Sequence, residues 1–455
     1  MKKLSVLLLA SAIVCAFTGQ AVASPFTAQE VAPLFSTQAV ASPFRTEAVA
    51  SSYIRQAVAS PFIRQAVASP LDFLFGKNEH AEKEFFAMDT VMSVSVNGKN
   101  AEKAAEAVAD EVNRLDKLLS TGSSDSEVSL INENGGGTLG PDGCALMKKA
   151  LGLYEDSEGL FDISIYPVME LWGFASGELH ISSEVSSGVG DGDSGDTSDE
   201  IRASEQLSEG SVGDAGDTSD EIRVSEQLSE GNVEDTDDTL DRFRVPTAEE
   251  IDEALKLVDA SSIRFDEETG EVFFDMEGMK IDFGGIAKGY TSSRMMDILR
   301  EQGIESALVN LGGNVQALGT KPDGSKWRVG VQDPGDDSGL LGILEIADLA
   351  VITSGGYERY FEEDGQVYHH IIDPRTGFPA NTGLTSVTIV SSDGTLADGL
   401  STFLFIAGEE QAEAYWRSHA EKFDMILAKE DGTLLVTEGI EDAFSTEYEY
   451  EVIAL

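Results

Sequence analysis

The sequence predicts an α+β fold, a single domain in which helices pack on antiparallel sheets. A helix is predicted at 101–119, because apolar residues recur on one face there, with Asn100 as its N-cap. Short apolar runs predict strands at 307–311, 385–390, 423–427 and 434–436. The last two strands are joined across Asp431-Gly432, a favoured hairpin turn. These patterns interleave along about 310 residues once low-complexity stretches are set aside, a length within the range of one domain.

The first residues have the features of a signal peptide. Two lysines precede a long apolar run, and Ala21-Val22-Ala23 has the form of a cleavage site, so residues 1–23 are predicted to be removed on export. A lipid anchor at Cys15 is the disfavoured alternative, because Val14 is too bulky for a good lipoprotein motif. We therefore expect an extracytoplasmic protein, periplasmic or at the cell surface. Its mature form would keep only Cys144 and form no intrachain disulfide.

The domain is expected to span 77–455. One low-complexity stretch precedes it and a second interrupts it. Residues 24–76 contain a nine-residue repeat whose prolines interrupt helices and strand ladders alike, which predicts a weakly ordered tether. Residues 177–241 are rich in Asp, Glu, Ser and Gly, with too few apolar side chains to offset the entropy of folding, which predicts a disordered insert. Calcium binding by the insert is disfavoured, because its Asp spacing lacks the EF-hand pattern.

The formal net charge of -51 excludes some classes of partner. Nucleic-acid binding needs Lys and Arg for phosphate contacts, so we expect no nucleic-acid partner. The same charge argues against direct adhesion to anionic lipid.

The most informative motif joins an apolar strand to a helix through a double glycine. The strand at 280–283, predicted to form a hairpin with 272–275 around Gly278, runs into Gly284-Gly285 and then into a helical pattern. A helix N-terminus reached through glycines is suited to phosphate. Lys288 adds a cation where the helix dipole disfavours one, which indicates an anionic ligand. A tight connection with a merely solvated lysine is the alternative.

A second motif places Asp398 and Thr402 four residues apart at the start of a predicted helix, and so on one face. A carboxylate and a hydroxyl, with no His or Cys nearby, form an oxygen site suited to Mg²⁺. In the alternative, Asp398 faces the dipole of its own helix and Thr402 bonds to the carbonyl of Asp398.

A third motif is an adjacent histidine pair that ends a predicted strand before the turn Asp373-Pro374-Arg375-Thr376-Gly377. His369 and His370 should point to opposite faces, so only one is expected to serve a site. A histidine exchanges protons near neutral pH, although a single histidine on a strand is more commonly structural.

Taken together, these motifs closely resemble those of the ApbE-like FAD:protein FMN transferase family. The resemblance covers nearly all of the chain outside the two low-complexity stretches. Further blocks occur in the family's order: Ala87-Met88-Asp89-Thr90, Ser126-Glu127-Val128-Ser129, Phe161-Asp162-Ile163-Ser164, Leu171-Trp172-Gly173-Phe174, Asn310-Leu311-Gly312-Gly313-Asn314 and Thr353-Ser354-Gly355. The resemblance implies two related halves, like the T-fold. The sequence departs from the family pattern at two positions: Gly122, where the family usually has an aromatic residue, and Ser293, where it often has an Asp.

The resemblance also implies roles for single residues. His370 and six others would line the pocket of FAD, the substrate: Met88, Phe161, Asp162, Gly284, Lys288 and Tyr290. The carbonyl of Ala287, with Asp398 and Thr402, would hold Mg²⁺ beside the pyrophosphate, and His370 would stand near the reacting phosphate.

The implied activity is transfer of FMN from FAD to a Thr or Ser hydroxyl of a target flavoprotein, expected to be membrane-associated, with release of AMP. His370 and Asp282 are the candidate bases, although Asp282 could instead simply cap the glycine loop. An FAD pyrophosphatase and a non-catalytic exported flavin-binding protein are the alternatives.

Overall fold

The computed structural model describes residues 79–175, 222–224 and 243–455. The predicted signal peptide, the predicted tether and most of the predicted insert lie outside these residues. No helix in the described part of the chain is long and apolar enough to cross a membrane.

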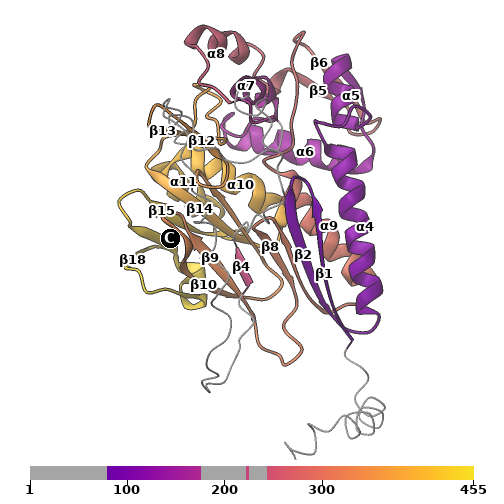
Figure 1. The fold of residues 1–455 in the computed structure, drawn as a ribbon, viewed down its shortest axis with the longest axis vertical. Helices are drawn as coiled ribbons and strands as arrows, with labels where there is room; N and C mark the ends of the chain where they lie inside the picture. The colour runs from indigo at the N-terminus through magenta and orange to yellow at the C-terminus, as the bar shows by residue number, and fades with distance from the viewer. Residues whose placement is uncertain (1–78, 176–221, 225–242) are drawn as a thin grey trace, which may run out of the picture. The chain divides into compact units, whose positions relative to one another are not determined.

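A nine-stranded sheet forms the centre of the fold (Figure 1). In spatial order its strands are β1 (His80–Ala87), β2 (Thr90–Asn97), β7 (Ser306–Leu311), β8 (Asn314–Leu318), β11 (Ala350–Gly355), β14 (Leu384–Ser391), β15 (Asp424–Lys429), β16 (Leu434–Thr437) and β18 (Tyr450–Ile453). Neighbouring strands are antiparallel except for β16 and β18. The predicted α+β fold with antiparallel sheets is therefore confirmed.

Four helices pack on one face of this sheet: α4 (Ala101–Leu119), α9 (Ala287–Glu301), α10 (Gly394–Ala407) and α11 (Glu409–His419). Among the strands of the central sheet and the helices on it, apart from β18, the same order occurs twice: β1-β2-α4-α9-β7-β8, then β11-β14-α10-α11-β15-β16, with other elements inserted between some of them. The element order thus repeats, as expected for two related halves.

A second sheet packs on the opposite face of the first. Its strands are, in order, β17 (Phe444–Ser445), β10 (Asp336–Ile346), β9 (Trp327–Asp333) and β4 (Ile222–Val224). Strand alternation divides the core: Ile352 of β11 packs with the helices, whereas its neighbour Val351 packs with the second sheet. The prediction that the whole insert lacks regular structure is wrong for β4, which pairs parallel with β9.

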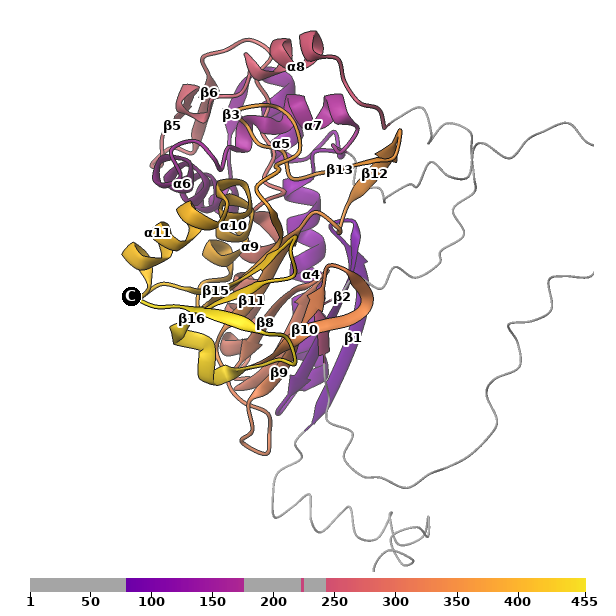
Figure 2. The same cartoon turned by 90° about the vertical axis from the view of Figure 1, so that its left-hand side faces the viewer.

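The remaining described helices and strands, apart from a 3₁₀ turn near the C-terminus, gather at one end of the central sheet (Figures 1 and 2). They are β3 (Gly136–Thr138), α5 (Glu127–Asn134), α6 (Pro141–Asp156), η2 (Ile163–Ile165), α7 (Tyr166–Trp172), α8 (Ala248–Leu255), η4 (Ala260–Ser262), β5 (Ile263–Phe265), β6 (Glu271–Phe274), β12 (Tyr360–Glu363) and β13 (Gln366–His369). The β12–β13 hairpin projects from the body in Figure 2.

The predicted helix at 101–119 is confirmed as α4, and the predicted β15–β16 hairpin turns at Gly432, with φ of 85°. Asn100 does stand at the N-cap of α4, but its side chain makes no capping bond there. The hairpin predicted around Gly278 is wrong, because β6 pairs with β3 and β5 instead.

A side chain replaces the missing strand partner of the 280–283 segment. The amide of Asn132 accepts from Ile281 N at 2.7 Å and donates to Ile281 O at 2.8 Å. Asp282 N then donates to Ile163 O at 2.8 Å. These bonds satisfy the backbone groups that a neighbouring strand would have bonded, so the segment enters the double glycine as an extended loop.

Candidate functional site

A cavity of about 910 Å³ lies among the β1–β2 turn, the loop before α9, the end of β11, the segment after β13 and helix α10. All of the predicted site residues except Tyr290 line it: Met88, Phe161, Asp162, Asp282, Gly284, Ala287, Lys288, His370, Asp398 and Thr402. A cavity of this volume accommodates a ligand the size of a nucleotide cofactor.

The glycine loop is shaped by Asp282. Its Oδ1 accepts a hydrogen bond from Gly284 N at 3.0 Å, so Asp282 caps the loop as well as lining the cavity. A Cβ atom on Gly285 would lie 3.2 Å from the ring of Phe161 and 3.6 Å from Thr402 Oγ1. The backbone here therefore approaches both walls of the cavity closely, as a phosphate-binding loop requires.

Asp398 binds the first turn of α9 directly. Its Oδ2 accepts from Gly289 N at 2.7 Å, and its Oδ1 accepts from Asn314 Nδ2 at 2.9 Å. Helix α10 begins earlier than predicted, at Gly394 with Asp393 as N-cap, so Asp398 lies in its second turn. Asp398 thus satisfies the N-terminus of another helix rather than its own.

Thr402 does not bond to the carbonyl of Asp398. Ser401 makes that bond, at 2.8 Å, while Thr402 Oγ1 lies 3.3 Å from Ser354 Oγ. The hydroxyl of Thr402 is therefore directed to the end of β11 and the cavity, as the predicted metal site requires.

The charge state of Asp398 depends on its surroundings. Its side chain is only 5 % exposed, and burial raises the pKa of the carboxyl, whereas Lys288 and the two hydrogen-bond donors lower it. A buried carboxylate is costly without a compensating cation. Asp398 is therefore suited to a bound cation.

The donor set fits Mg²⁺. No cluster of three or more His, Cys, Asp or Glu able to hold a metal occurs among the described residues. Where α9 and α10 meet, the cavity wall instead presents the Asp398 carboxylate, the Thr402 hydroxyl and the carbonyl of Ala287, the first residue of α9, which accepts a hydrogen bond from Thr291 Oγ1 at 2.8 Å. Mg²⁺ commonly takes one or two carboxylates and completes its shell with water and phosphate.

Glycines allow α9 and α10 to touch at the site. A Cβ atom on Gly289 would lie 2.2 Å from Gly394 O and 2.5 Å from Asp398 Cβ. Only a residue without a side chain fits between the two helices. Gly289 therefore sets the distance over which Asp398 reaches the N-terminus of α9.

We expect Gly289→Ala to lower the free energy of unfolding by about 1–3 kcal/mol, because the added methyl forces the helices apart. Gly152 in α6 provides the control: a Cβ there meets nothing within 4 Å, so Gly152→Ala should be neutral or stabilising by up to about 1 kcal/mol. Urea unfolding of both variants measures the difference. If Gly289→Ala and Gly152→Ala are equally stable, the contact between α9 and α10 is not tight.

The two histidines face different surroundings, as predicted. His370 lines the cavity, and its Nδ1 lies 3.2 Å from Arg359 O. Burial, followed by the charge of Arg359, holds the pKa of His370 well below its ordinary value. His369 Nε2 lies 3.0 Å from Ala380 O, and its ring packs edge-on against Phe405. Burial lowers the pKa of both histidines, and only His370 faces the cavity.

Two other predicted residues have structural partners. The Asp162 carboxylate accepts from Ser164 N and Oγ at 2.8 and 2.6 Å and from Ala260 N at 3.2 Å, so it ties η2 to η4. Burial raises the pKa of Asp282, an effect that Gly284 N–H and Arg359 oppose. Both side chains line the cavity, but each already has a role in shaping it.

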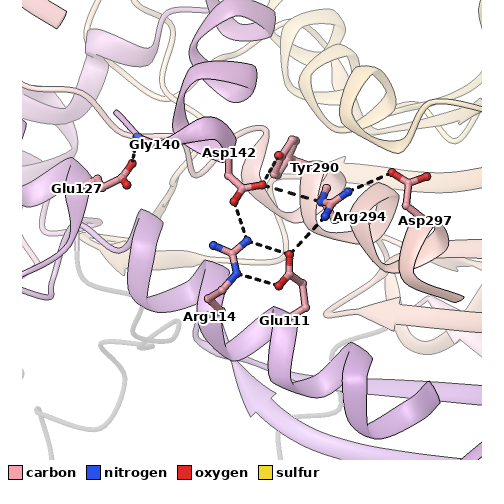
Figure 3. A network of polar contacts seen from close by, with 8 residues as sticks. All are labelled: Glu111, Arg114, Glu127, Gly140, Asp142, Tyr290, Arg294 and Asp297. Atoms are coloured by element: carbon pink, nitrogen blue, oxygen red, sulfur yellow. Dashed lines mark hydrogen bonds and ion pairs between the residues drawn. The ribbon is translucent and has the colours of Figure 1, made fainter. Parts of the chain in front are cut away.

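The prediction that Tyr290 lines the cavity is wrong. Its hydroxyl donates to Asp142 Oδ1 at 2.7 Å, within a polar network that joins α4, α6 and α9 (Figure 3). Arg114 donates to Asp142 at 2.6 Å and to Glu111 at 2.8 Å in the same network. Tyr290 therefore anchors the first turn of α9 to α6 through Asp142, which Arg114 in turn joins to α4.

The structure adds residues that the sequence did not single out. Asn314 orients Asp398, and Arg359 lies beside His370. Met88 and Asp89 form the two-residue β1–β2 turn with φ of 48° and 59°, a conformation costly for residues other than glycine. Asn314 ends the quoted Leu-Gly-Gly-Asn block, whereas nothing local distinguishes Arg359.

The two departures noted in the sequence can also be placed. Gly122 lines the cavity, and a Cβ there would have only Ser120 Oγ, at 3.7 Å, within 4 Å. Ser293 does not line the cavity, and its buried hydroxyl has no hydrogen-bond partner among the described residues. The absent aromatic therefore leaves open space at the cavity wall, whereas the absent carboxylate does not affect the wall.

The ApbE family model matches residues 88–205 and 230–427. The chain belongs to the ApbE family. An FAD:protein FMN transferase of Klebsiella pneumoniae (strain 342) is 42 % identical over 194 residues, 42 % of this chain and 59 % of that protein. An FAD:protein FMN transferase of Salmonella typhimurium (strain LT2) is 25 % identical over 356 residues, 76 % of this chain and 83 % of that protein. The match to the first of these relatives thus spans about three fifths of its length.

A solved structure agrees with the family assignment. The ApbE protein of Thermotoga maritima superposes with a TM-score of 0.62 at 29 % identity, covering 80 % of this chain and 99 % of that one. The flavin transferase ApbE of Vibrio cholerae, at 22 % identity and a TM-score of 0.57, shares the fold. The predicted family and its α+β domain are therefore confirmed for this ApbE-family chain.

Proposed function

We propose that this ApbE-family protein transfers FMN from FAD to a Thr or Ser hydroxyl of a target protein and releases AMP. The observation that carries the proposal is the bond between Asp398 and the first turn of α9, which puts a carboxylate and a phosphate-binding helix end on one cavity wall. Relatives that bear the name FAD:protein FMN transferase support the same activity.

The residues have distinct tasks in this reaction. Lys288, together with the positive dipole end of α9, would bind the pyrophosphate of FAD. His370 would accept the proton of the acceptor hydroxyl, whose oxygen forms a bond to the phosphorus of the FMN half. The bond from that phosphorus to the bridging oxygen breaks, and the oxygen leaves with AMP. Asp282 shapes the loop in this scheme, which leaves His370 as the base.

Mg²⁺, bound by Ala287 O, Asp398 and Thr402, would neutralise charge on the pyrophosphate oxygens. The test of the proposal is incubation of the mature protein with FAD, Mg²⁺ and an exported flavoprotein that carries candidate threonines. We expect the acceptor to gain the mass of one FMN and AMP to appear in equal amount. FAD left intact under these conditions would refute the proposal.

One observation favours an FAD pyrophosphatase as the second candidate. The open space beside Gly122 leaves room for water near the ligand. This activity predicts free FMN and AMP in equal amounts without any adduct on the acceptor, so the same assay separates the two. A non-catalytic flavin-binding role is disfavoured, because storage does not require the oxygen donors of Asp398 and Thr402.

The proposed function includes a location for the protein and a class of acceptor. We infer that the chain is exported and cleaved after Ala23 and that its acceptor is a membrane-associated flavoprotein. Support comes from the basic and apolar start of the sequence and from the acidic net charge of -51, which disfavours lipid and nucleic acid as direct partners. N-terminal sequencing of the secreted protein should begin at Ser24. An intact N-terminus on the exported protein would contradict the cleavage site.

We expect deletion of residues 182–238 to leave transfer activity nearly unchanged, because this segment has too few apolar side chains to form a core of its own. The deletion removes β4, so β9 would keep only β10 as a described neighbour, and a small loss of thermal stability should follow. A short Gly-Ser linker closes the loop at little entropic cost. Loss of transfer in a folded deletion variant would show that the insert contacts the acceptor.

A further inference from the structure

Arg359 lies at the base of the β12–β13 hairpin, one step beyond the paired residues Tyr360 and His369. The pairing continues past the strands, because His370 N donates to Arg359 O at 3.0 Å. Arg359 Nη2 donates to Phe174 O at 2.9 Å, just beyond the end of α7. The side chain lines the same cavity as His370. Arg359 is therefore held at both its backbone and its side chain beside the candidate base.

The backbone contact determines which ring nitrogen of His370 carries hydrogen. Nδ1 lies 3.2 Å from Arg359 O, and a carbonyl oxygen can only accept a hydrogen bond. Nδ1 is therefore the donor. In the neutral ring Nε2 then has a free lone pair, which is the form that a general base needs.

The charged groups around His370 are mostly cations. Arg359, His369 and Lys288 each disfavour a positive charge on the ring and so lower the pKa of His370, in addition to burial. The carboxylates that line the same cavity near Arg359 are Asp282 and Glu358. Burial raises the pKa of Asp282, which makes its charged form less available to balance these cations.

We propose that Arg359 is a positioning residue for His370: its carbonyl selects the Nδ1–H tautomer, and its guanidinium, held to Phe174 O, places a fixed positive charge in the cavity that the ring lines. This inference rests on the proposed function, because it assigns His370 the task of a base. The guanidinium of Arg359 stays protonated at physiological pH, so it acts on the ring as a fixed positive charge and does not transfer a proton to it.

The test is histidine ¹⁵N NMR on the full chain, which has five histidines, with His370→Ala used to assign the signal. In the wild-type protein we expect the Nδ1–H tautomer and a titration midpoint for His370 well below that of an ordinary histidine. In Arg359→Met the midpoint should move up measurably, because a nearby like charge is removed. Arg359→Lys keeps the charge and should titrate like the wild type.

Arg375→Met is the matched control, because Arg375 is a nearby arginine that pairs with Asp373 at 2.7 Å and does not line the cavity. It should leave the titration of His370 unchanged. A wild-type Nε2–H tautomer, or identical titration in Arg359→Met and the wild type, would overturn the inference. Arg359→Gln serves if the methionine variant does not fold.

A kinetic measurement gives an independent readout. In Arg359→Met the acidic limb of the turnover rate should move toward neutral pH, whereas a purely structural loss would lower the rate equally at all pH values. The NMR measurements contain no FAD and no acceptor. Failure of the proposed transfer and failure of this inference are therefore observed in separate experiments.

Discussion

Asp398→Asn is expected to lower Mg²⁺-dependent turnover by ~10²–10³ while the protein remains folded. Amide and carboxylate have the same shape, so the bond from Gly289 N can persist, but the neutral group no longer attracts the cation. The rate at limiting Mg²⁺ measures the effect. Full activity of the variant at low Mg²⁺ would refute the metal assignment.

The same variant should be at least as stable as the wild type at neutral pH without metal. Burial raises the pKa of Asp398 above its unfolded value, so the charged form lowers the free energy of unfolding. This penalty disappears as the pH falls below the unfolded value, and asparagine removes it at every pH. Mg²⁺ should raise the melting temperature of the wild type but not that of Asp398→Asn. Asp393→Asn, which alters the N-cap of α10 outside the cavity, should lose stability but keep its response to Mg²⁺.

His370→Ala is expected to reduce the turnover rate by ~10²–10⁴ while FAD affinity changes little, because the ring serves proton transfer rather than binding. Single-turnover formation of the FMN adduct, together with the dissociation constant of FAD, measures both quantities. Unchanged adduct formation would show that another group takes the proton.

His369→Ala is the matched control on the neighbouring residue. It should keep nearly the wild-type rate, because His369 does not line the cavity. It should also lose about 1–3 kcal/mol of stability, since Ala380 O is left without its partner and the packing against Phe405 is lost. Equal loss of rate in both histidine variants would contradict the assignment of His370 as base.

Local patterns in the sequence were sufficient for the elements that depend on near neighbours. The helix at 101–119 and the β15–β16 hairpin have clear apolar periodicity or a Gly turn, and both form as predicted. The segment 280–283 was misassigned because its backbone partner is the side chain of Asn132, which no local pattern in 280–283 reveals. Extended backbone with an apolar sequence is not always a strand.

The residues of the site likewise divide into those that local patterns indicate and those that only tertiary contacts bring together. Spacing alone indicated that Asp398 and Thr402 share a face, and the motif order indicated which residues line the cavity. Tyr290 was misplaced because it follows Lys288 by two residues, roughly 200° around the helix, and therefore faces Asp142 instead. The contact of Asp398 with Gly289 and that of His370 with Arg359 come from tertiary packing, which the sequence does not encode in any single window.

The glycine contact between α9 and α10 has a consequence for the order of folding. Asp398 and Gly289 are 109 residues apart in the chain, so we expect their bond to form late, once the intervening central-sheet strands β7, β8, β11 and β14 have assembled and offset the entropy of closing this loop. A partly folded chain would present the helix end without its carboxylate, and hence no binding site. Retention of FAD during refolding would therefore report completion of the whole domain, and the ligand would add to the stability of the native state alone.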